Sequence, residues 1–240
     1  MSGAAAAAEG HSGRAEAEGD SAAAAGPGRA QGRAAAPDGG SGSGAAAAGT
    51  GGPGPLERGR FPAGQSALLV EFPAAERLVA HWRRRHDPSA AAGIPAHVTV
   101  LFPFLDAGAD GRPGSVDDTV REELRTLFAA HPAFTVTFTA LRRFPDVVYL
   151  APEPAAPLQA LTTAAVARWP DTQPYGGQFA EVVPHLTVAH SDDPELLAAA
   201  EAALAPHLPV TAEAAAVSLY VSDGERWHRR TSFPLGGASV

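Results

Sequence analysis

Residues 95–103 read Pro-Ala-His-Val-Thr-Val-Leu-Phe-Pro, and residues 184–189 read Pro-His-Leu-Thr-Val-Ala. Both stretches contain β-branched and apolar residues in a run of strand length, and prolines bound them, so the sequence predicts a short strand at each place. The two stretches share the pattern histidine, any residue, threonine, valine. This shared pattern is the feature from which the rest of the chain can be interpreted.

Side chains alternate between the two faces of a β-strand, so His97 and Thr99 are expected to point the same way. The same alternation places His185 and Thr187 on one face of the second strand. The residues between them are apolar and are expected to face a core that holds each strand rigid. Each strand therefore presents an imidazole next to a hydroxyl on one surface.

The two motif strands each occupy the middle of a longer pattern that occurs twice. The first copy predicts strand 66–72, helix 74–86, strand 97–102, a helix started by a Ser115–Asp118 capping box, and strand 134–141. The second copy predicts strand 146–150, helix 157–169, strand 184–188, a helix that Asp193 caps and that runs to about residue 207, and strand 216–222. A last strand over residues 229–235 is expected to cross back onto one of the sheets.

A unit that occurs twice in the order β-α-β-α-β favours an α+β fold with two lobes related by a pseudo-two-fold axis. We expect each half to form a small antiparallel sheet with helices on one face. Equivalent residues face each other across such an axis. The two motif strands would then line opposite walls of one central cleft.

Residues 1–60 differ in composition from the rest of the chain and consist almost entirely of Ala, Gly, Ser, Pro and Arg. Leu56 is their only large aliphatic residue apart from the initiator methionine, so they bury too little apolar surface to offset the entropy of ordering a backbone. We expect a disordered tail over 1–60 and one folded domain over 61–240. The tail shows no leucine-rich segment of the kind that a secretory signal contains.

Composition also limits the classes of partner and chemistry. The chain has no cysteine, which excludes disulfides, thiolate catalysis and cysteine-bound zinc and fits a reducing cytoplasm. No apolar run reaches the roughly 20 residues that cross a bilayer, so no membrane association is expected. Residues 61–240 contain 13 arginines against 20 acidic residues, a net charge of −7, and this balance argues against binding of long duplex nucleic acid. A small phosphate ester or an RNA end is the expected partner, bound by a monomer.

Two facing imidazoles are suited to cleavage of a phosphodiester by in-line attack. One histidine can take a proton from the nucleophile while the other gives a proton to the leaving oxygen, and an unperturbed pKa of about 6.5 allows both forms near neutral pH. The hydroxyls of Thr99 and Thr187 can donate hydrogen bonds to the non-bridging oxygens. This scheme needs no metal and no cofactor.

A single histidine of this kind is most often a half-buried structural residue, whereas two at matching positions of a repeated unit favour a functional pair. A metal-dependent hydrolase would use His97 and His185 as ligands, but each strand supplies one nitrogen and no accompanying carboxylate. A non-catalytic module that binds a nucleotide or an RNA end is the main alternative, although binding alone has little need for two opposed imidazoles.

The sequence resembles the two-histidine phosphoesterase superfamily, and within it the 2′-5′ RNA ligase and cyclic phosphodiesterase group. The resemblance covers about 175 residues and rests on residues 95–104, on Arg143-Phe144-Pro145 before a strand, on residues 184–189, and on Trp227 followed by residues 233–235. It implies a two-lobed fold and metal-independent hydrolysis of 2′,3′-cyclic phosphates, which usually leaves a 2′-phosphate. Some members also join RNA ends through a 2′-5′ link.

By motif match, the resemblance implies that His97 and His185 form the acid and base pair and that Thr99 and Thr187 contact phosphate. The sequence favours His185 only weakly as the residue that activates water. The tail is not part of the family pattern.

Further residues have both a functional and a structural interpretation. Tyr175, in residues 175–179, belongs either to a flap whose aromatic rings stack on a base or to an ordinary turn. Phe144 is either a platform for a base or a core residue. Arg143 and its neighbour Arg142 are candidates for binding a substrate phosphate, while residues 83–85, all arginine, are expected on a solvated helix face. His190 lies at an odd offset from His185, which would place it on the opposite face if the strand stayed regular, and a position at the strand end or in a loop is the expected one.

Overall fold

The computed structural model describes residues 61–109, 114–179 and 181–236, which fall within one compact unit. The predicted tail over 1–60 lies outside the described residues. The elements, in chain order, are β1 (Ser66–Glu71), α1 (Pro73–His86), α2 (Pro88–Ala91), β2 (His97–Leu101), α3 (Asp118–Ala129), β3 (Phe134–Phe144), β4 (Val147–Glu153), α4 (Ala156–Arg168), η1 (Pro174–Gly177), β5 (Leu186–His190), α5 (Pro194–Leu204), η2 (Ala205–His207), β6 (Val210–Ala214), β7 (Ala216–Ser222) and β8 (Trp227–Pro234).

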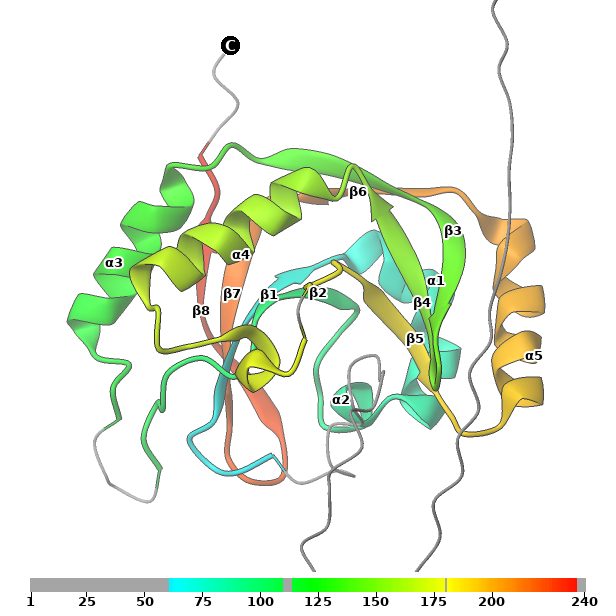
Figure 1. The fold of residues 1–240 in the computed structure, drawn as a ribbon, viewed down its shortest axis with the longest axis horizontal. Coiled ribbons are helices and arrows are strands. Elements are labelled where there is room, and N and C mark those ends of the chain that lie inside the picture. Colours follow the sequence, from blue (N-terminus) through cyan, green and yellow to red (C-terminus); the bar gives the residue numbers. More distant parts are fainter. Residues whose placement is uncertain (1–60, 110–113, 180, 237–240) are drawn as a thin grey trace, which may run out of the picture. The chain divides into compact units, whose positions relative to one another are not determined.

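The strands form two four-stranded sheets, in the orders β2-β1-β7-β8 and β5-β4-β3-β6, and every neighbouring pair is antiparallel (Figure 1). The predicted α+β class with antiparallel sheets is confirmed. The assignment of strands to sheets differs from the expectation that each half builds its own sheet. The last strand of the first half, β3, pairs with β4 of the second half. The last strand of the second half, β7, pairs with β1 of the first half.

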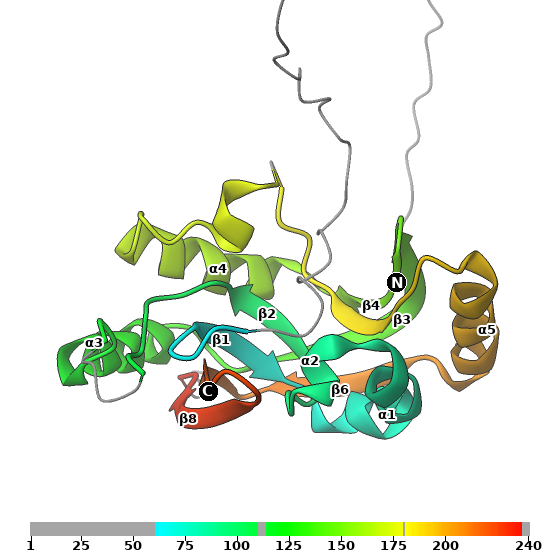
Figure 2. The same ribbon diagram turned by 90° about the horizontal axis from the view of Figure 1, so that it is seen from below.

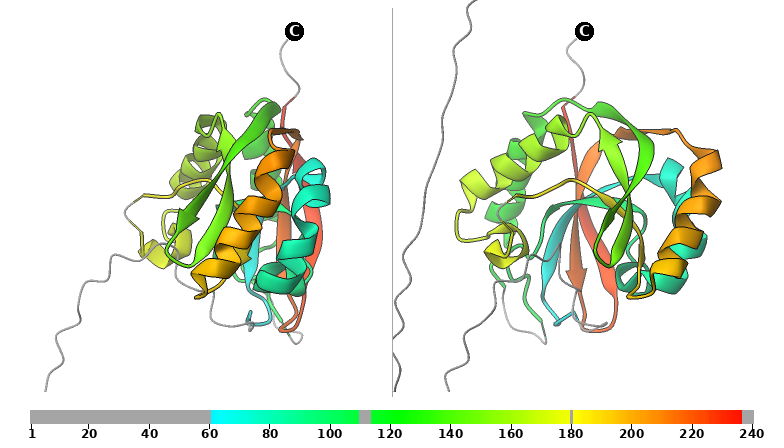
Figure 3. Two further views of the ribbon diagram at one scale, coloured as in Figure 1. Left: turned by 90° about the vertical axis from the view of Figure 1, so that its right-hand side faces the viewer. Right: turned by 45° about the vertical axis from the view of Figure 1, so that its right-hand side comes forward.

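The helices connect the two sheets in a way that keeps the two motif strands close. Helix α1, which follows the first strand of one sheet, packs against β5 of the other, and α4, which follows β4, packs against β2. The hydroxyl of Thr162 in α4 donates to the Val100 carbonyl at 2.8 Å. Helices α3 and α4 lie together at one end of the sheets, and α1 and α5 lie together at the other (Figures 1, 2 and 3). Strands β2 and β5 also contact each other directly.

A β-bulge occurs at the same place in both motif strands. In β2, Thr99 pairs with Leu69 and Leu101 with Leu68, so Val100 has no partner of its own. In β5, Thr187 pairs with Tyr149 and Ala189 with Val148, which leaves the residue between them as the extra one. A bulge of one residue reverses the facing of every side chain that follows it.

Helix boundaries agree with the sequence in one case and correct it in another. Helix α5 begins at Pro194, and the Asp193 carboxylate accepts a hydrogen bond from the Glu195 amide at 2.9 Å, as predicted. Helix α3 does not begin with the predicted Ser115 capping box. Its cap is Asp117, whose carboxylate accepts from the Val120 amide at 2.9 Å.

Strand β6 was missed by the sequence analysis, because its alternation is carried by small alanines rather than by large apolar residues. None of the helices within the described ranges is long and apolar enough to cross a membrane.

Candidate active site

One pocket brings together all four side chains of the two motifs. His97 and Thr99 reach it from β2, and Thr187 reaches it from β5 with His185 just before that strand. The pocket contains about 650 Å³ of empty space, counting the part open to solvent. The predicted juxtaposition of two strands distant in sequence is therefore present in the structure.

The two imidazoles are held by matching hydrogen bonds. His97 Nδ1 lies 2.8 Å from the carbonyl oxygen of Pro95, and His185 Nδ1 lies 2.8 Å from the carbonyl oxygen of Val183. A carbonyl oxygen can only accept, so Nδ1 must carry the proton in both rings. This fixes the tautomer and leaves Nε2 of each ring as the nitrogen that can take or give a proton.

The surroundings lower the pKa of both histidines but through different groups. Burial lowers the pKa of His97 to about 4, with a further contribution from the Arg83 guanidinium, against the opposing effects of the Pro95 carbonyl and Asp87. Burial also lowers the pKa of His185, and nearby His190 adds to this effect. At neutral pH both rings of the empty site are therefore mainly neutral.

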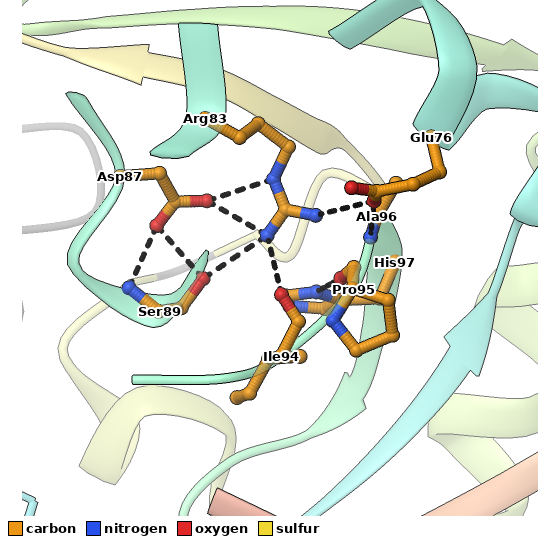
Figure 4. Close-up of polar contacts among 8 residues, drawn as sticks. All are labelled: Glu76, Arg83, Asp87, Ser89, Ile94, Pro95, Ala96 and His97. Carbon is orange, nitrogen blue, oxygen red and sulfur yellow. Dashed lines mark hydrogen bonds and ion pairs between the residues drawn. The ribbon is translucent and has the colours of Figure 1, made fainter. Parts of the chain in front are cut away.

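A buried ionic network lies behind His97, as Figure 4 shows. Arg83 is only 1% exposed, and it donates to the Asp87 carboxylate from Nε at 3.0 Å and from Nη2 at 2.8 Å. The Asp87 carboxylate also accepts from the Ser89 hydroxyl at 2.7 Å. Burial opposes ionisation of Asp87, but the Arg83 guanidinium and the Ser89 hydroxyl hold its pKa below the usual value. The expectation of a solvated face for residues 83–85 is thus wrong for Arg83.

The same network holds the backbone that orients His97. Arg83 Nη2 is 3.4 Å from the Ile94 carbonyl oxygen, and the Glu76 carboxylate accepts from the Ala96 amide (Figure 4). These two contacts flank Pro95, whose carbonyl accepts from His97. Within the described part of the chain, Arg83 Nη1 has no hydrogen-bond partner. It lies 3.7 Å from the Glu76 carboxylate, an ionic contact too long for a hydrogen bond.

An aromatic pair packs against His185 in place of an ionic network. Phe144 and Tyr149 stack with ring centroids 4.4 Å apart, and the Phe144 ring meets the His185 ring edge to face at 5.2 Å. Phe144 is not among the residues that line the pocket. Its contacts are those of a residue that orients His185, and its predicted contact with a base stays a prediction.

Arg143 also lies outside the pocket lining. Its Nε and Nη2 atoms donate to the two carboxylate oxygens of Glu201, each at 2.7 Å. A guanidinium bound at both positions in this way is engaged with a protein carboxylate rather than presented to a substrate. The predicted phosphate contact of Arg143 has no support from this geometry and stays a prediction.

Tyr175 lines the pocket from the short helix η1. Its backbone has φ 51° and ψ 32°, a left-handed conformation that few residues other than glycine adopt. The Tyr175 amide donates to the Phe102 carbonyl at 2.6 Å. Burial raises the pKa of the Tyr175 hydroxyl. The segment is therefore a turn that also places an aromatic ring in the pocket. A flap whose rings stack on a base stays a prediction.

His190 is the last residue of β5, at the strand end where it was expected, but it lines the pocket rather than the opposite face. The bulge in β5 is the reason, because it returns the residue five positions after His185 to the side of the motif. Phe102 stands at the same offset from His97, follows the matching bulge, and also lines the pocket.

The sequence analysis missed other pocket residues as well: Phe61, Ala67, Leu69, Asp87, Ser89, Ile94 and Trp227. Trp227 had entered only as part of the family pattern. Asp87 accepts from the Ser89 amide at the start of α2, so its sequence context is that of an ordinary helix cap. Nothing local marks it as a pocket residue.

Known proteins provide an independent comparison. Solved structures of E. coli LigT match at 20% identity and a TM-score of 0.43 for its complex with ATP, and at 19% and 0.45 for its complex with 3′-AMP. Each match covers 73% of this chain and 99% of LigT. TT0787 of Thermus thermophilus matches at 16% identity and a TM-score of 0.48, over 72% of this chain and 99% of its own. Curated proteins give no match.

A family model covers both motif strands and most of the residues that line the pocket. The model describes the 2′-5′ RNA ligase superfamily and matches residues 70–226, which include both motifs and most of the 240 residues. The resemblance noted from the sequence is therefore confirmed, and the chain belongs to the 2′-5′ RNA ligase superfamily.

Proposed function

We propose that this protein hydrolyses a 2′,3′-cyclic phosphate, at an RNA end or in a cyclic nucleotide, by acid and base catalysis with His97 and His185 and without a metal. The observation that carries the proposal is the matched pair of imidazoles in one pocket, each with Nδ1 bonded to a carbonyl and Nε2 left for proton transfer. Within the described ranges no group of three or more ligating side chains is placed to hold a metal ion.

The reaction needs two proton transfers on opposite sides of phosphorus. A water oxygen attacks phosphorus as one Nε2 takes its proton, and the bond from phosphorus to O3′ breaks as the other Nε2–H gives a proton to that oxygen. The product is a 2′-phosphate with a free 3′ hydroxyl. Each transfer is typically worth ~10²–10⁴-fold in rate. The hydroxyls of Thr99 and Thr187 donate to the non-bridging oxygens and stabilise the charge that develops there.

The two imidazoles have different charged groups near them, and this difference supports an assignment of their roles. The Arg83 guanidinium disfavours a second positive charge on His97, and the pKa of His97 falls to about 4. Arg83 acts on the pKa of His97 and not on that of His185, and this difference supports placing the proton on His185 when the pair holds one. We assign His97 as the base that activates water and His185 as the acid, in place of the reverse order that the sequence weakly favoured.

The same two groups can serve RNA ligation. If the 5′ hydroxyl of a second RNA end takes the place of water, the base takes its proton, the bond from phosphorus to O3′ breaks as the acid protonates that oxygen, and a 2′-5′ link forms beside a free 3′ hydroxyl. The net charge of −7 over residues 61–240 disfavours binding of a second RNA strand, which ligation requires and hydrolysis does not. Hydrolysis is therefore the main activity proposed.

The test is an assay of the purified chain in EDTA with nucleoside 2′,3′-cyclic phosphates and ADP-ribose cyclic phosphate, with products assigned by ³¹P NMR. We expect turnover to a 2′-phosphate, and a loss of at least ~10²-fold in His97→Asn and in His185→Asn. Asparagine retains a donor at the position of Nδ1 and removes Nε2. His207→Asn changes an exposed histidine outside the pocket and serves as the matched control.

Three results would count against the proposal. Binding of the nucleotide with no turnover would support the alternative of a recognition module. Loss of activity in EDTA with recovery on added metal would support a metal-dependent hydrolase. Full activity in either motif variant would remove that histidine from the mechanism.

A further inference from the structure

A second hollow adjoins the catalytic pocket and is lined by cationic side chains. Its lining includes Arg84, Arg85 and His86 from the last turn of α1, together with Asp87 and His190. Asp87 and His190 also line the catalytic pocket, so the two spaces adjoin at these residues. This arginine hollow contains about 510 Å³ of empty space, counting the part open to solvent.

The arginine hollow has an excess of positive charge in an otherwise acidic domain. Its one carboxylate, Asp87, is already engaged by Arg83 at 2.8 Å and so offers little charge to a neighbour. Among the described residues, no carboxylate forms an ion pair with Arg84 or Arg85, both of which are exposed, although Arg85 contacts the His81 ring at 2.7 Å. The domain over 61–240 carries a net charge of −7, so this concentration of cations is local.

Cations at the end of α1 have an ordinary structural role, because they interact favourably with the C-terminal carbonyls of a helix. That role accounts for arginines in the last turn but not for a hollow lined by them beside the catalytic pocket. His190, which follows the bulge in β5, lines both spaces. A ligand held between His97 and His185 therefore has a cationic surface beside it.

We propose that the arginine hollow binds the phosphate on the 5′ oxygen of the nucleotide whose 2′,3′-cyclic phosphate occupies the catalytic pocket. The inference rests on the proposed function and narrows its substrate class. The preferred substrate is a cyclic nucleotide that also carries a 5′-phosphate, either as a free monoester or as the diester that joins it to an RNA chain. Arginine is suited to this task because its planar guanidinium can donate two hydrogen bonds to one phosphate.

Binding is tested without turnover by calorimetry on the full chain, with adenosine 2′,5′-bisphosphate and adenosine 2′-monophosphate. We expect the wild type to bind the bisphosphate about 10-fold more tightly, in line with charge-assisted hydrogen bonds to one added phosphate. In the double variant Arg84→Gln/Arg85→Gln the preference should fall below about 3-fold, while the affinity for the monophosphate stays the same. The charge-matched control, Arg77→Gln/Arg230→Gln, changes two exposed arginines outside both spaces and should keep the preference.

Turnover then distinguishes the two sources of the 5′-phosphate. We expect a lower KM for a 5′-phosphorylated cyclic nucleotide than for its 5′-hydroxyl form, and an equally low KM for a dinucleotide with a cyclic end if RNA is accepted. A low KM for the monoester alone would identify free nucleotides as the source.

Two results would overturn the inference while leaving hydrolysis intact: equal affinity of the wild type for the two adenosine ligands, or a preference that survives in Arg84→Gln/Arg85→Gln. The opposite combination, a preference that depends on these arginines with no hydrolysis of any cyclic substrate, would refute the proposed activity and leave the phosphate site standing.

Discussion

Burial of His97 as a neutral ring predicts a specific dependence of stability on pH. Its pKa is about 4 in the folded protein and about 6.5 in an unfolded chain. The folded pKa is the lower one, so the unfolded state binds the proton more tightly. The stability associated with this neutral ring is fully present above pH 6.5 and is lost progressively as the pH falls toward 4.

The size of the effect follows from these two values. Between pH 7 and pH 5 the difference in proton binding at this one site lowers the free energy of unfolding by about 2 kcal/mol. His97→Asn removes the titrating group and keeps a donor for the Pro95 carbonyl. The variant is therefore expected to lose about 2 kcal/mol less stability than the wild type over this pH interval, whatever its stability at pH 7.

Urea denaturation at pH 7 and pH 5 measures this difference, and His207→Asn is the control for loss of an exposed histidine outside the pocket. The control should lose as much stability as the wild type. If the wild type and His97→Asn lose equal stability between the two pH values, His97 is not held neutral in the folded protein. The assignment of His97 as the base would then lose its physical reason.

Three further predictions concern the same site. Arg83→Met should lower the free energy of unfolding by ~3–5 kcal/mol, because it leaves the buried Asp87 charge without its partner, and Arg83→Met/Asp87→Leu should recover most of that loss in urea denaturation. Because the pKa values of both His97 and His185 lie below 6.5, kcat/KM should be highest on the acid side of pH 6.5 and fall as the pH rises; a maximum near pH 8 would contradict the shifts. Thr187→Val, which removes a hydroxyl at nearly constant volume, should lower kcat by ~10²-fold in a steady-state assay, and an unchanged kcat would remove that hydroxyl from the stabilisation of phosphate charge.

The motif strands could be predicted because the alternation of a strand is local and has a period of two. His97 and Thr99 share a face, as do His185 and Thr187, for this reason alone. The repeat of the pattern then predicted that the two strands meet. The pairing of β7 with β1 was not predictable in the same way, since the two strands lie far apart in the sequence and the local pattern carries no information about their contact. The pairing of β3 with β4 did have a local signal, because only residues 145–146 connect the two strands.

Each bulge had a signal in the sequence that could have predicted it. Val100 and Leu101 are consecutive apolar residues, and both are buried, as are Val188 and Ala189. In a strand with one polar face, two buried residues in succession indicate an extra residue. Recognition of this doublet would have placed His190 in the pocket.

The burial of Arg83 also had a local signal. Ala75 and Val79 lie at intervals of four residues before it and share the buried face of α1. The same interval continues to Asp87, its partner. A charged residue on an apolar helix face with an opposite charge four positions later is typical of a buried ion pair, whereas a run of three arginines suggests a solvated surface. The four-residue interval therefore predicts the burial of Arg83 correctly, whereas the run of three arginines does not.

The most direct test of the central claim is a crystal structure of the protein with a bound nucleoside 2′-phosphate, the expected product. The account predicts that the phosphate lies between the motif strands, with its oxygens within about 2.6–3.2 Å of Nε2 of both His97 and His185. A phosphate held by only one imidazole, or bound outside this pocket, would contradict it.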